Sequence, residues 1–485
     1  MFSDMKPAER KLLEHCKVGK QLKIGTERPK VKTVDNEIRG EFLRHLILNN
    51  NQEIEESGKK YVLKIDLKGI MFSGVFISGN FDFSFCNTDL LLFIESSVLE
   101  NEINLMYSKI GLLYFLGSKL KAIKGYGLIC VKDIIFIKSE VEGELNFGFS
   151  EIRNLIFIDG NISNQDGDAL NCLSVIIKGN IQFSQNYIEG NLILSLAKID
   201  NLLTLSNLNL TGNIEFEVTE TNTLNIEGSK FWEQEKLKEF KLDGFKYNHL
   251  LGKNLDSSTL EKWLDKMPEF KPQPYKQLAK VLRNMGHQKE ANDVMIEYNE
   301  QLRKKDFVTF DRLFISVFKW IYGKTSGYGY KPMKVFWTML IVWFLCSLFY
   351  WKASSVAVFA PSNPLIFQHK DYKVKIADEG TAIGDFFNSK DYKCEDEKLE
   401  CNNWINSKLL DEEYTTFNPF WYSLDVILPI VDLQVEKDWG QYVSSNNGTL
   451  NDFTRWLMWF EILFGWIYSL ILVAILSGLA KNEKD

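Results

Sequence analysis

The chain repeats a short unit whose clearest copies are Gly179-Asn180-Ile181-Gln182-Phe183 and Gly190-Asn191-Leu192-Ile193-Leu194. Each copy places Gly and a polar residue before a run of alternating apolar side chains. Further copies are Gly79-Asn80-Phe81-Asp82-Phe83, Gly143-Glu144-Leu145-Asn146-Phe147 and Gly212-Asn213-Ile214-Glu215-Phe216. Leu192 and Ile214 hold equivalent places 22 residues apart, and this spacing indicates coils of about 21 residues.

Strands this short cannot form a core alone, so the repeat predicts a stack of coils. Each coil buries its inward Ile, Leu and Phe against the next coil. Gly and Asn suit the corners because they tolerate left-handed backbone conformations. We therefore expect a β-solenoid of about seven or eight coils over residues 69–232. This segment resembles the solenoids of pentapeptide-repeat and bactofilin-like proteins, and residues 1–68 are expected to form an N-terminal cap region.

After the repeat, the hydrophobic period changes from 2 to 3.6. Residues 233–305 are expected to form a helical linker that ends in a hairpin, with its turn at Gly286. Residues 307–321 then place apolar and charged side chains on opposite sides. This pattern is typical of a helix lying in a membrane interface. We expect the interfacial helix and a following hinge within residues 306–332.

Two segments, residues 333–351 and 456–480, are long and apolar enough to cross about 30 Å of hydrocarbon. Lysines precede the first segment and follow the second, at Lys331, Lys334, Lys481 and Lys484. Positive charge favours the cytoplasmic side of a membrane. The sequence therefore predicts a multi-pass protein of a bacterial inner membrane, in contact with lipid and with both termini in the cytoplasm.

The net charge indicates which partners the chain can bind, and the cysteines bear on which compartment each part of it occupies. The formal net charge of −7 at pH 7 argues against nucleic acid as a partner. Residues 352–417 lie between the two spans and are expected outside the cytoplasm. They contain Cys394 and Cys401, which an oxidising compartment would allow to pair. Two alternatives stay open for this pair: a disulfide that closes a small loop, or two free thiols.

An aromatic amphipathic stretch, Trp421-Tyr422-Ser423-Leu424-Asp425, lies between the two spans. With the spans, it resembles the two-transmembrane pore-loop superfamily typified by bacterial potassium channels. In that family the pore helix often has Trp, an aromatic residue, Ser, an apolar residue and an acid in this order. The resemblance implies that residues 418–436 form a pore helix and a filter-like loop. It also implies a homo-oligomer, a tetramer in the family, with cations as the transported partner.

The filter departs from the family pattern, which is Thr-Val-Gly-Tyr-Gly. This chain has Leu-Pro-Ile-Val-Asp-Leu-Gln at residues 428–434, without the glycines that turn successive carbonyls toward the axis. The candidate filter residues are Pro429, Ile430, Val431, Asp432 and Leu433. Asp432 aligns with the filter tyrosine, and a ring of carboxylates there would select cations. The alternative is an exposed loop acid or an N-terminal helix cap.

The second span carries Glu461 four residues before Gly465, a spacing similar to that in inner helices of related two-span proteins. Gly465 would permit a bend and close packing. A carboxylate is costly in lipid, so Glu461 is expected to face protein. Two roles stay open for Glu461: contact with ions, or a tie between the span and the pore loop.

The stretch Gly327-Tyr328-Gly329-Tyr330 contains the letters of a potassium filter but precedes the first span. A filter must follow a pore helix between two spans. The sequence therefore predicts a hinge at the membrane interface, formed by Gly327, Gly329 and Pro332.

No enzymatic activity is expected. Acidic residues of the repeat, such as Glu144 and Glu215, occur mostly once per coil at outward positions, which suits solvated faces better than a catalytic cleft. The five histidines are scattered, leaving no recognisable metal or nucleophile constellation. Glycine loops for phosphate binding are missing, so no cofactor and no metal is expected.

The function expected from the sequence is an oligomeric cation channel, or a channel-like protein, gated by a cytoplasmic β-solenoid that senses a ligand or protein. The alternative is a membrane-anchored scaffold or sensor whose pore-like domain does not conduct. Simple anchoring does not require the re-entrant segment at residues 421–434, and this segment favours the pore.

Overall fold

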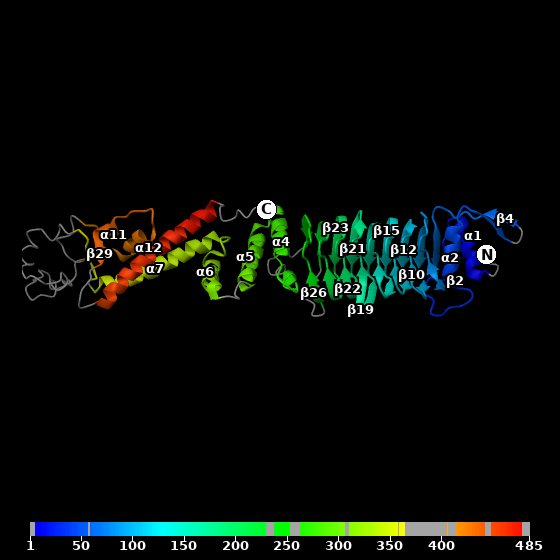
Figure 1. The fold of residues 1–485 in the computed structure, drawn as a ribbon, viewed down its shortest axis with the longest axis horizontal. Helices are drawn as coiled ribbons and strands as arrows, with labels where there is room; N and C mark the ends of the chain where they lie inside the picture. The colour runs from blue at the N-terminus through cyan, green and yellow to red at the C-terminus, as the bar shows by residue number, and fades with distance from the viewer. Residues whose placement is uncertain are drawn as a thin grey trace, which may run out of the picture. The chain divides into compact units, whose positions relative to one another are not determined.

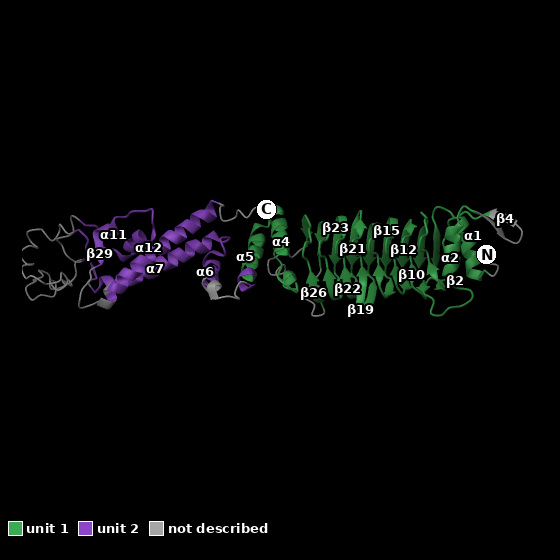
Figure 2. Ribbon diagram, viewed as in Figure 1, with its two compact units in different colours: residues 1–301 green, residues 302–485 purple. Residues whose placement is uncertain are grey.

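The computed structural model describes residues 5–56, 59–228, 237–252, 262–305, 310–356, 358–363, 405, 414–441 and 448–477. The chain divides into two compact units, Met1–Gln301 and Leu302–Asp485, which are coloured separately in Figure 2. The first unit contains the repeats, and the second contains both long apolar helices. Each unit is described by itself below.

Residues 70–251 form a β-solenoid of about eight turns, which confirms the interpretation of the repeat. Successive coils stack their strands in parallel, as Figure 1 shows. Strand pairing continues past residue 232 to β27 (His249–Leu251), which pairs with β25 (Glu220–Asn225). Because the strands are parallel and in register, each position in one coil lies over its equivalent in the next coil.

Two parallel sheets form the walls of the solenoid. The first comprises β1 (Leu22–Lys23), β5 (Ile70–Ser73), β8 (Leu91–Glu95), β11 (Lys109–Ile110), β12 (Leu112–Leu116), β15 (Ile129–Ile137), β18 (Glu151–Ile158), β20 (Ile176–Ile177), β21 (Asn180–Ser184), β23 (Lys198–Ser206), β25 and β27. The second comprises β2 (Glu37–Arg39), β6 (Phe76–Ser78), β7 (Phe81–Asp82), β9 (Val98–Leu99), β10 (Ile103–Asn104), β13 (Lys119–Leu120), β14 (Ile123–Lys124), β16 (Glu140–Glu142), β17 (Leu145–Asn146), β19 (Asn161–Asn171), β22 (Tyr187–Ile193), β24 (Asn209–Glu215) and β26 (Leu237–Lys241).

The solenoid core contains a column of stacked phenylalanines. Phe115, Phe136, Phe157 and Phe183 come from four successive coils, and all are buried. Their ring centroids are 5.0, 4.9 and 5.1 Å apart, and the rings are nearly parallel. This spacing matches the distance between neighbouring strands, so each ring buries the faces of the next.

The Gly-Asn pair of the repeat has a steric and a hydrogen-bonding reason. Gly212 has a φ of +136°, and a Cβ there would lie 2.5 Å from the carbonyl oxygen of Gly190 in the preceding coil. The following asparagines form a ladder, in which the backbone N–H of Asn213 donates to Oδ1 of Asn191 over 3.0 Å. Gly143 and Gly190 hold the same position in their coils, also with positive φ, whereas Asp168, Lys121 and Asn101 hold it in other coils.

Helices cover the first coil. The N-terminal part contains α1 (Pro7–Lys17), α2 (Gly40–Leu48) and a hairpin of β3 (Glu53–Glu56) with β4 (Lys59–Val62). Glu9 of α1 is fully buried and accepts hydrogen bonds from Arg39 Nε (2.8 Å) and Nη2 (2.7 Å). Its carboxylate also accepts from the backbone N–H groups of Lys6 and Arg39. These bonds satisfy a buried charge that would otherwise destabilise this end.

The last coil is covered by α4 (Pro272–Asn284), which is followed by α5 (Gln288–Lys305). Gln273 of α4 accepts from the N–H of Gly244 and donates to the carbonyl oxygen of Phe245, both over 3.0 Å. The helix thereby supplies hydrogen bonds that a further coil would have supplied, and it protects the open end of the solenoid.

The second unit is helical. Its elements are α6 (Phe310–Ser326), α7 (Pro332–Ser354), β28 (Phe359–Pro361), α10 (Pro419–Ile427), α11 (Val435–Asp438), β29 (Trp439–Gln441) and α12 (Gly448–Leu476). Strands β28 and β29 pair in antiparallel fashion. Helix α7 and residues Asp452–Leu476 of α12 are long and apolar enough to cross a membrane. The two apolar helices expected from the sequence are therefore present.

Replacing Phe157 with alanine should lower the free energy of unfolding of the solenoid by about 3–5 kcal/mol, because it leaves a cavity between two stacked rings. Thermal or denaturant unfolding followed by circular dichroism would measure this loss. The exposed Lys132→Ala substitution is the control, with an expected change within about 0.5 kcal/mol. Equal stability of both variants would contradict the proposed core column.

Candidate functional site

The candidate site is built around α10, which is locally stabilised at its first turn. The side chain of Asn418 accepts hydrogen bonds from the N–H groups of Phe420 (2.9 Å) and Trp421 (3.3 Å). Pro419 follows at the first helical position, where its fixed φ suits a helix and its missing N–H is no loss. The sequence Asn-Pro therefore starts the helix at the point where the resemblance predicted a pore helix.

Glu461 of α12 ties α10 and α7 together. Its carboxylate accepts a hydrogen bond from Ser423 of α10 and another from the hydroxyl of Tyr350 of α7, over 2.8 Å in the second case. All three side chains are fully buried. Two roles were left open for Glu461, and these contacts are the ones expected if it joins the second apolar helix to α10.

Gly465 lies one helical turn after Glu461 and contacts the end of α10. A Cβ at Gly465 would overlap the carbonyl oxygen of Ile427, the last residue of α10. Only glycine lets the two backbones approach this closely. The pair Glu461 and Gly465, predicted from its spacing, therefore clamps α10 at two points.

Helix α7 holds α10 from a different side. The indole N–H of Trp343 donates to the carbonyl oxygen of Phe420 over 3.1 Å. Tyr350 packs edge-on against Tyr422, with ring centroids 5.1 Å apart. These contacts join a buried aromatic cluster that also includes Phe359, Phe417 and Trp439. Helix α10 is consequently fixed by both long apolar helices.

Asp425 shapes the turn that follows α10. Its carboxylate accepts hydrogen bonds from the backbone N–H of Leu433 (2.7 Å) and of Glu436 (2.9 Å). Gln434 between them is left-handed, with a φ of +64°. The side chain of Asp425 is buried. This predicted pore residue therefore holds the turn in place through two hydrogen bonds on its buried side.

Asp432 lies at the exposed surface of that turn. Its carboxylate accepts from the backbone N–H of Gln434 over 3.0 Å and forms an ion pair with Lys437. The hydrogen bond from Lys437 is the main cause that lowers the pKa of Asp432. Burial, together with the charges of Asp425 and Asp432, raises the pKa of Glu436 above its usual value. The turn thus carries a mixed but mainly acidic surface.

The other predicted filter residues differ in exposure. Ile430 is 85% exposed and Val431 is also exposed, whereas Pro429 is half-buried and Leu433 packs against the aromatic cluster. Trp421 projects from α10 and is exposed as well. The chain therefore presents apolar side chains around the turn that no described residue of the same chain covers.

The predicted hinge has a defined backbone. Gly327, Tyr328 and Gly329 are all left-handed, with φ values of +60°, +53° and +86°. Pro332 follows as the first residue of α7. Just before this turn, Thr325 of α6 accepts a hydrogen bond from the hydroxyl of Tyr468 in α12, over 2.9 Å. This turn is therefore connected to the second apolar helix as well as to the first.

Two predicted residues, Cys394 and Cys401, lie outside the described residues. The sequence did not show which residues the other predicted side chains bind, although Ser423 itself belongs to the predicted pore-helix motif. Tyr350 and Ser423 form the buried network with Glu461, and Lys437 pairs with Asp432. A local signal existed only for Lys437, which follows Asp432 by five residues.

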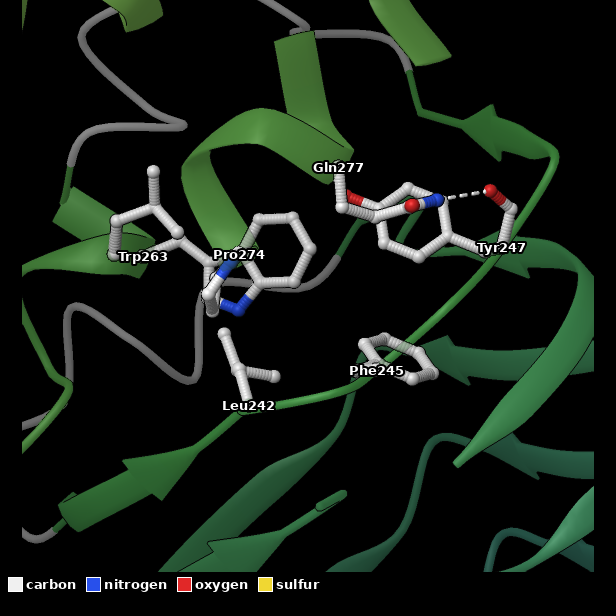
Figure 3. A pocket seen from close by; sticks show the side chains of 7 residues that line it. Leu242, Phe245, Tyr247, Trp263, Pro274 and Gln277 are labelled. Carbon is white, nitrogen blue, oxygen red and sulfur yellow. Dashed lines mark hydrogen bonds between the residues drawn. The ribbon is translucent and has the colours of Figure 1, made fainter. Parts of the chain in front are cut away.

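A small apolar pocket lies in the first unit, between the last coil and α4. It is lined by Leu242, Phe245, Tyr247, Trp263, Leu264, Pro274 and Gln277. Figure 3 shows Gln277 beside Tyr247, whose carbonyl oxygen it reaches by a 2.5 Å hydrogen bond. The buried indole N–H of Trp263 has no hydrogen-bond partner among the described residues. The pocket belongs to the packing of α4 on the solenoid.

Comparison with protein-family models, with curated proteins and with solved structures found no match to this chain. Within the residues that the structure describes, no group of His, Cys, Asp and Glu side chains is placed to hold a metal ion. Helix α10, which α7 and α12 hold in place, and the turn after it form the candidate site.

Replacing Glu461 with leucine should destabilise the second unit by about 1–3 kcal/mol for each hydroxyl left without its acceptor. Glu461→Gln retains one acceptor oxygen and a similar shape, so its loss should be smaller. Thermal unfolding of the purified protein measures the difference. A leucine variant as stable as the parent would show that the hydrogen bonds of Glu461 do not stabilise the second unit.

Gly465→Ala should force α12 away from Ile427 and lower stability by about 1–3 kcal/mol through overpacking. Leu470→Ala, at an exposed position of the same helix, is the matched control and should change stability much less. The same unfolding experiment applies. Equal effects at the two positions would argue against close contact between α12 and the end of α10.

Proposed function

We propose that this chain is one subunit of a homo-oligomeric cation channel. In this proposal α7 and α12 cross a membrane, while α10 enters it from the outer side and turns back. The observation that carries the proposal is the clamp on α10 by Glu461 and Gly465. With nine residues, α10 is about 14 Å long and too short to cross about 30 Å of hydrocarbon.

The exposed surfaces of the two long helices support the membrane location. Leu463, Leu470 and Val473 of α12 are exposed, as are Trp337, Ile341 and Leu345 of α7. Only 22% of each apolar window is buried within the chain, which differs from the core helix of a soluble protein. Lipid tails would cover these side chains, while the polar groups of Glu461, Ser423 and Tyr350 are satisfied internally.

The turn after α10 supports assembly around an axis. Ile430 and Val431 are apolar and exposed in the single chain, and they lie beside the clamped helix. Contacts between copies at this turn would cover them and would bring one Asp432 from each subunit to a shared mouth. A ring of carboxylates is one known route to cation selectivity.

The charge of the turn is consistent with cations. From Asp425 to Asp438 the chain carries four carboxylates against one ammonium group, that of Lys437. Lys437 neutralises part of the field at Asp432. The remaining acids leave the mouth negative in each subunit, and several subunits together would concentrate cations there.

The hydrogen bond between Tyr468 and Thr325 offers a route for gating. It joins α6, the proposed interfacial helix, to α12, which would line the pore. A stimulus at the cytoplasmic solenoid would act through α6 if its affinity differs between the open and closed states. This route assigns a role to the interfacial helix that simple anchoring does not need.

A second candidate is a membrane scaffold with a non-conducting pore-like domain. Two features favour it: the turn from Leu428 to Gln434 contains no glycine, and Asp432 is already paired with Lys437 of its own chain. Such a protein would still assemble through α10, but it would carry no current.

Planar-bilayer recording in asymmetric salt tests the proposal. Parent protein should pass a cation-selective current, and Asp432→Asn should shift its reversal potential toward that of a non-selective pore. Lys437→Gln is the matched control, because it frees Asp432 and should preserve or increase cation selectivity. If well-folded oligomers pass no current at any voltage, the scaffold is favoured. If ion selectivity is unchanged in both variants, Asp432 does not line the mouth of the pore.

Tyr468→Phe should alter gating without changing ion preference, because it removes one hydrogen bond and keeps the ring. A single hydrogen bond contributes about 0.5–1.5 kcal/mol, so the ratio of open to closed channels should change about two- to tenfold. Tyr322, which packs edge-on against Tyr328, provides the matched Tyr322→Phe control. An unchanged open probability in the Tyr468 variant would exclude this contact from the gating route.

A further inference from the structure

Two corners of the solenoid repeat the same backbone geometry with different chemistry. At the first, which we name the polar column, successive left-handed residues are Ser96, Gly117, Lys138, Asp159, Gln185 and Asn207. At the second, the apolar column, they are Phe85, Tyr107, Gly127, Phe149, Ser174, Leu196 and Val218. The first set is typical of exposed turns. The second is not.

The backbone does not account for this difference. In the polar column, the N–H of Lys138 donates to the next coil at Ile158 over 2.9 Å. In the apolar column, the N–H of Tyr107 donates to the next coil at Tyr126, also over 2.9 Å. Both columns also have φ values near +55°. The same turn can therefore be made with small or polar residues.

The apolar side chains stack along the outside of the solenoid. Phe85 stacks on Tyr107 with ring centroids 5.6 Å apart, and Tyr107 contacts Tyr126 at 5.7 Å. Tyr126 in turn contacts Phe149 at 5.2 Å. Phe85 is 76% exposed, and the side chains of Tyr107, Phe149, Leu196 and Val218 are each more than half exposed. The stack is thus a surface feature rather than part of the core.

The residues of the apolar column cost free energy in two ways. Bulky and β-branched side chains are disfavoured in the left-handed conformation, and their exposed apolar surface stays in contact with water. The column carries little charge: from Ser84-Phe85 to Ser195-Leu196 the corner dipeptides contain no Asp, Glu, Lys or Arg, and the last one, Glu217-Val218, contains a single acid. Aromatic residues and Met without charge are the composition of an interface centre.

The size of the apolar column indicates which partner fits it. Its exposed side chains present on the order of 500 Å², which is the size of a functional patch on a protein surface. Two such columns together would bury about 1,000 Å², at the lower limit for a specific interface. A partner free in solution needs more area, whereas copies already held in one oligomer need less because their effective concentration is high.

We propose that the apolar column is the contact surface between the solenoids of neighbouring copies of this chain. This inference rests on the proposed function in one respect: it requires the copies to assemble. It does not require the assembly to conduct ions. The column meets its own counterpart, so the contact is the same on both copies and solenoids associate in pairs. Copies in one membrane share an orientation, and the equal rise per coil keeps the two columns matched along their length.

Disulfide cross-linking of the full chain in lipid nanodiscs tests the contact. Tyr107→Cys and Leu196→Cys lie in the apolar column, and Lys138→Cys and Asn207→Cys in the polar column are matched controls. Each is made in a Cys394→Ser, Cys401→Ser background, since the other five cysteines, in α1, the solenoid and α7, are buried. We expect covalent dimers, and no larger species, from the apolar column alone. Equal cross-linking at both columns, or none at the apolar column, would overturn the inference.

The native mass of the same samples separates this inference from the proposed function. Oligomers that lack the cross-link contradict the solenoid contact alone. Monomers contradict the assembly and the contact together.

A variant that combines Phe85→Asn, Tyr107→Asn and Phe149→Asn distinguishes assembly from folding. Asn tolerates the left-handed conformation better than the aromatic residues, so thermal stability of the solenoid should be retained or increased. Cross-linking through Leu196→Cys should fall at least several-fold in this variant. Full cross-linking together with a folded solenoid would show that the aromatic stack makes no contact with a second copy.

Discussion

Each coil of the solenoid hydrogen-bonds the backbone of its strands to the coils on either side, so these backbone groups depend on neighbours of similar shape. This constraint explains why Gly212 must approach Gly190 and why Asn213 bonds Asn191. It also explains the two ends, where no further coil is present. Helices supply the missing partners there, through the buried Glu9 with Arg39 at one end and through Gln273 at the other.

The helical unit meets a related demand with side chains. Helices α7 and α12 are apolar along most of their length, and a polar group buried between them needs a partner within the protein. Glu461 does so with Tyr350 and Ser423, and the resulting network fixes α10 between the two helices. The close contact of Gly465 with Ile427 holds the end of α10. The exposed turn that carries Asp432 is thereby positioned by buried groups.

The sequence predicted the features that repeat or that lie close together along the chain. The Gly-Asn units indicated the solenoid because several coils, such as those of Gly190 and Gly212, approach a neighbour too closely for a Cβ. Glu461 with Gly465 indicated a helix face directed toward protein. A tie between Glu461 and the pore loop was one of two roles left open, but the individual partners Tyr350 and Ser423, 111 and 38 residues away, could not be identified. The apolar column also escaped prediction, because unequal coil lengths obscure the alignment of Phe85, Tyr107 and Phe149, and only the backbone reveals their left-handed conformation.

The central claim is that α10 and its turn gather around a common axis in a membrane. Cryo-electron microscopy of the full chain in lipid nanodiscs tests this claim most directly. The account predicts several copies whose α7 and α12 cross the bilayer, with Ile430, Val431 and Asp432 of every copy facing one central axis. A single copy, or an oligomer in which these turns face lipid or lie far from any shared axis, would contradict it.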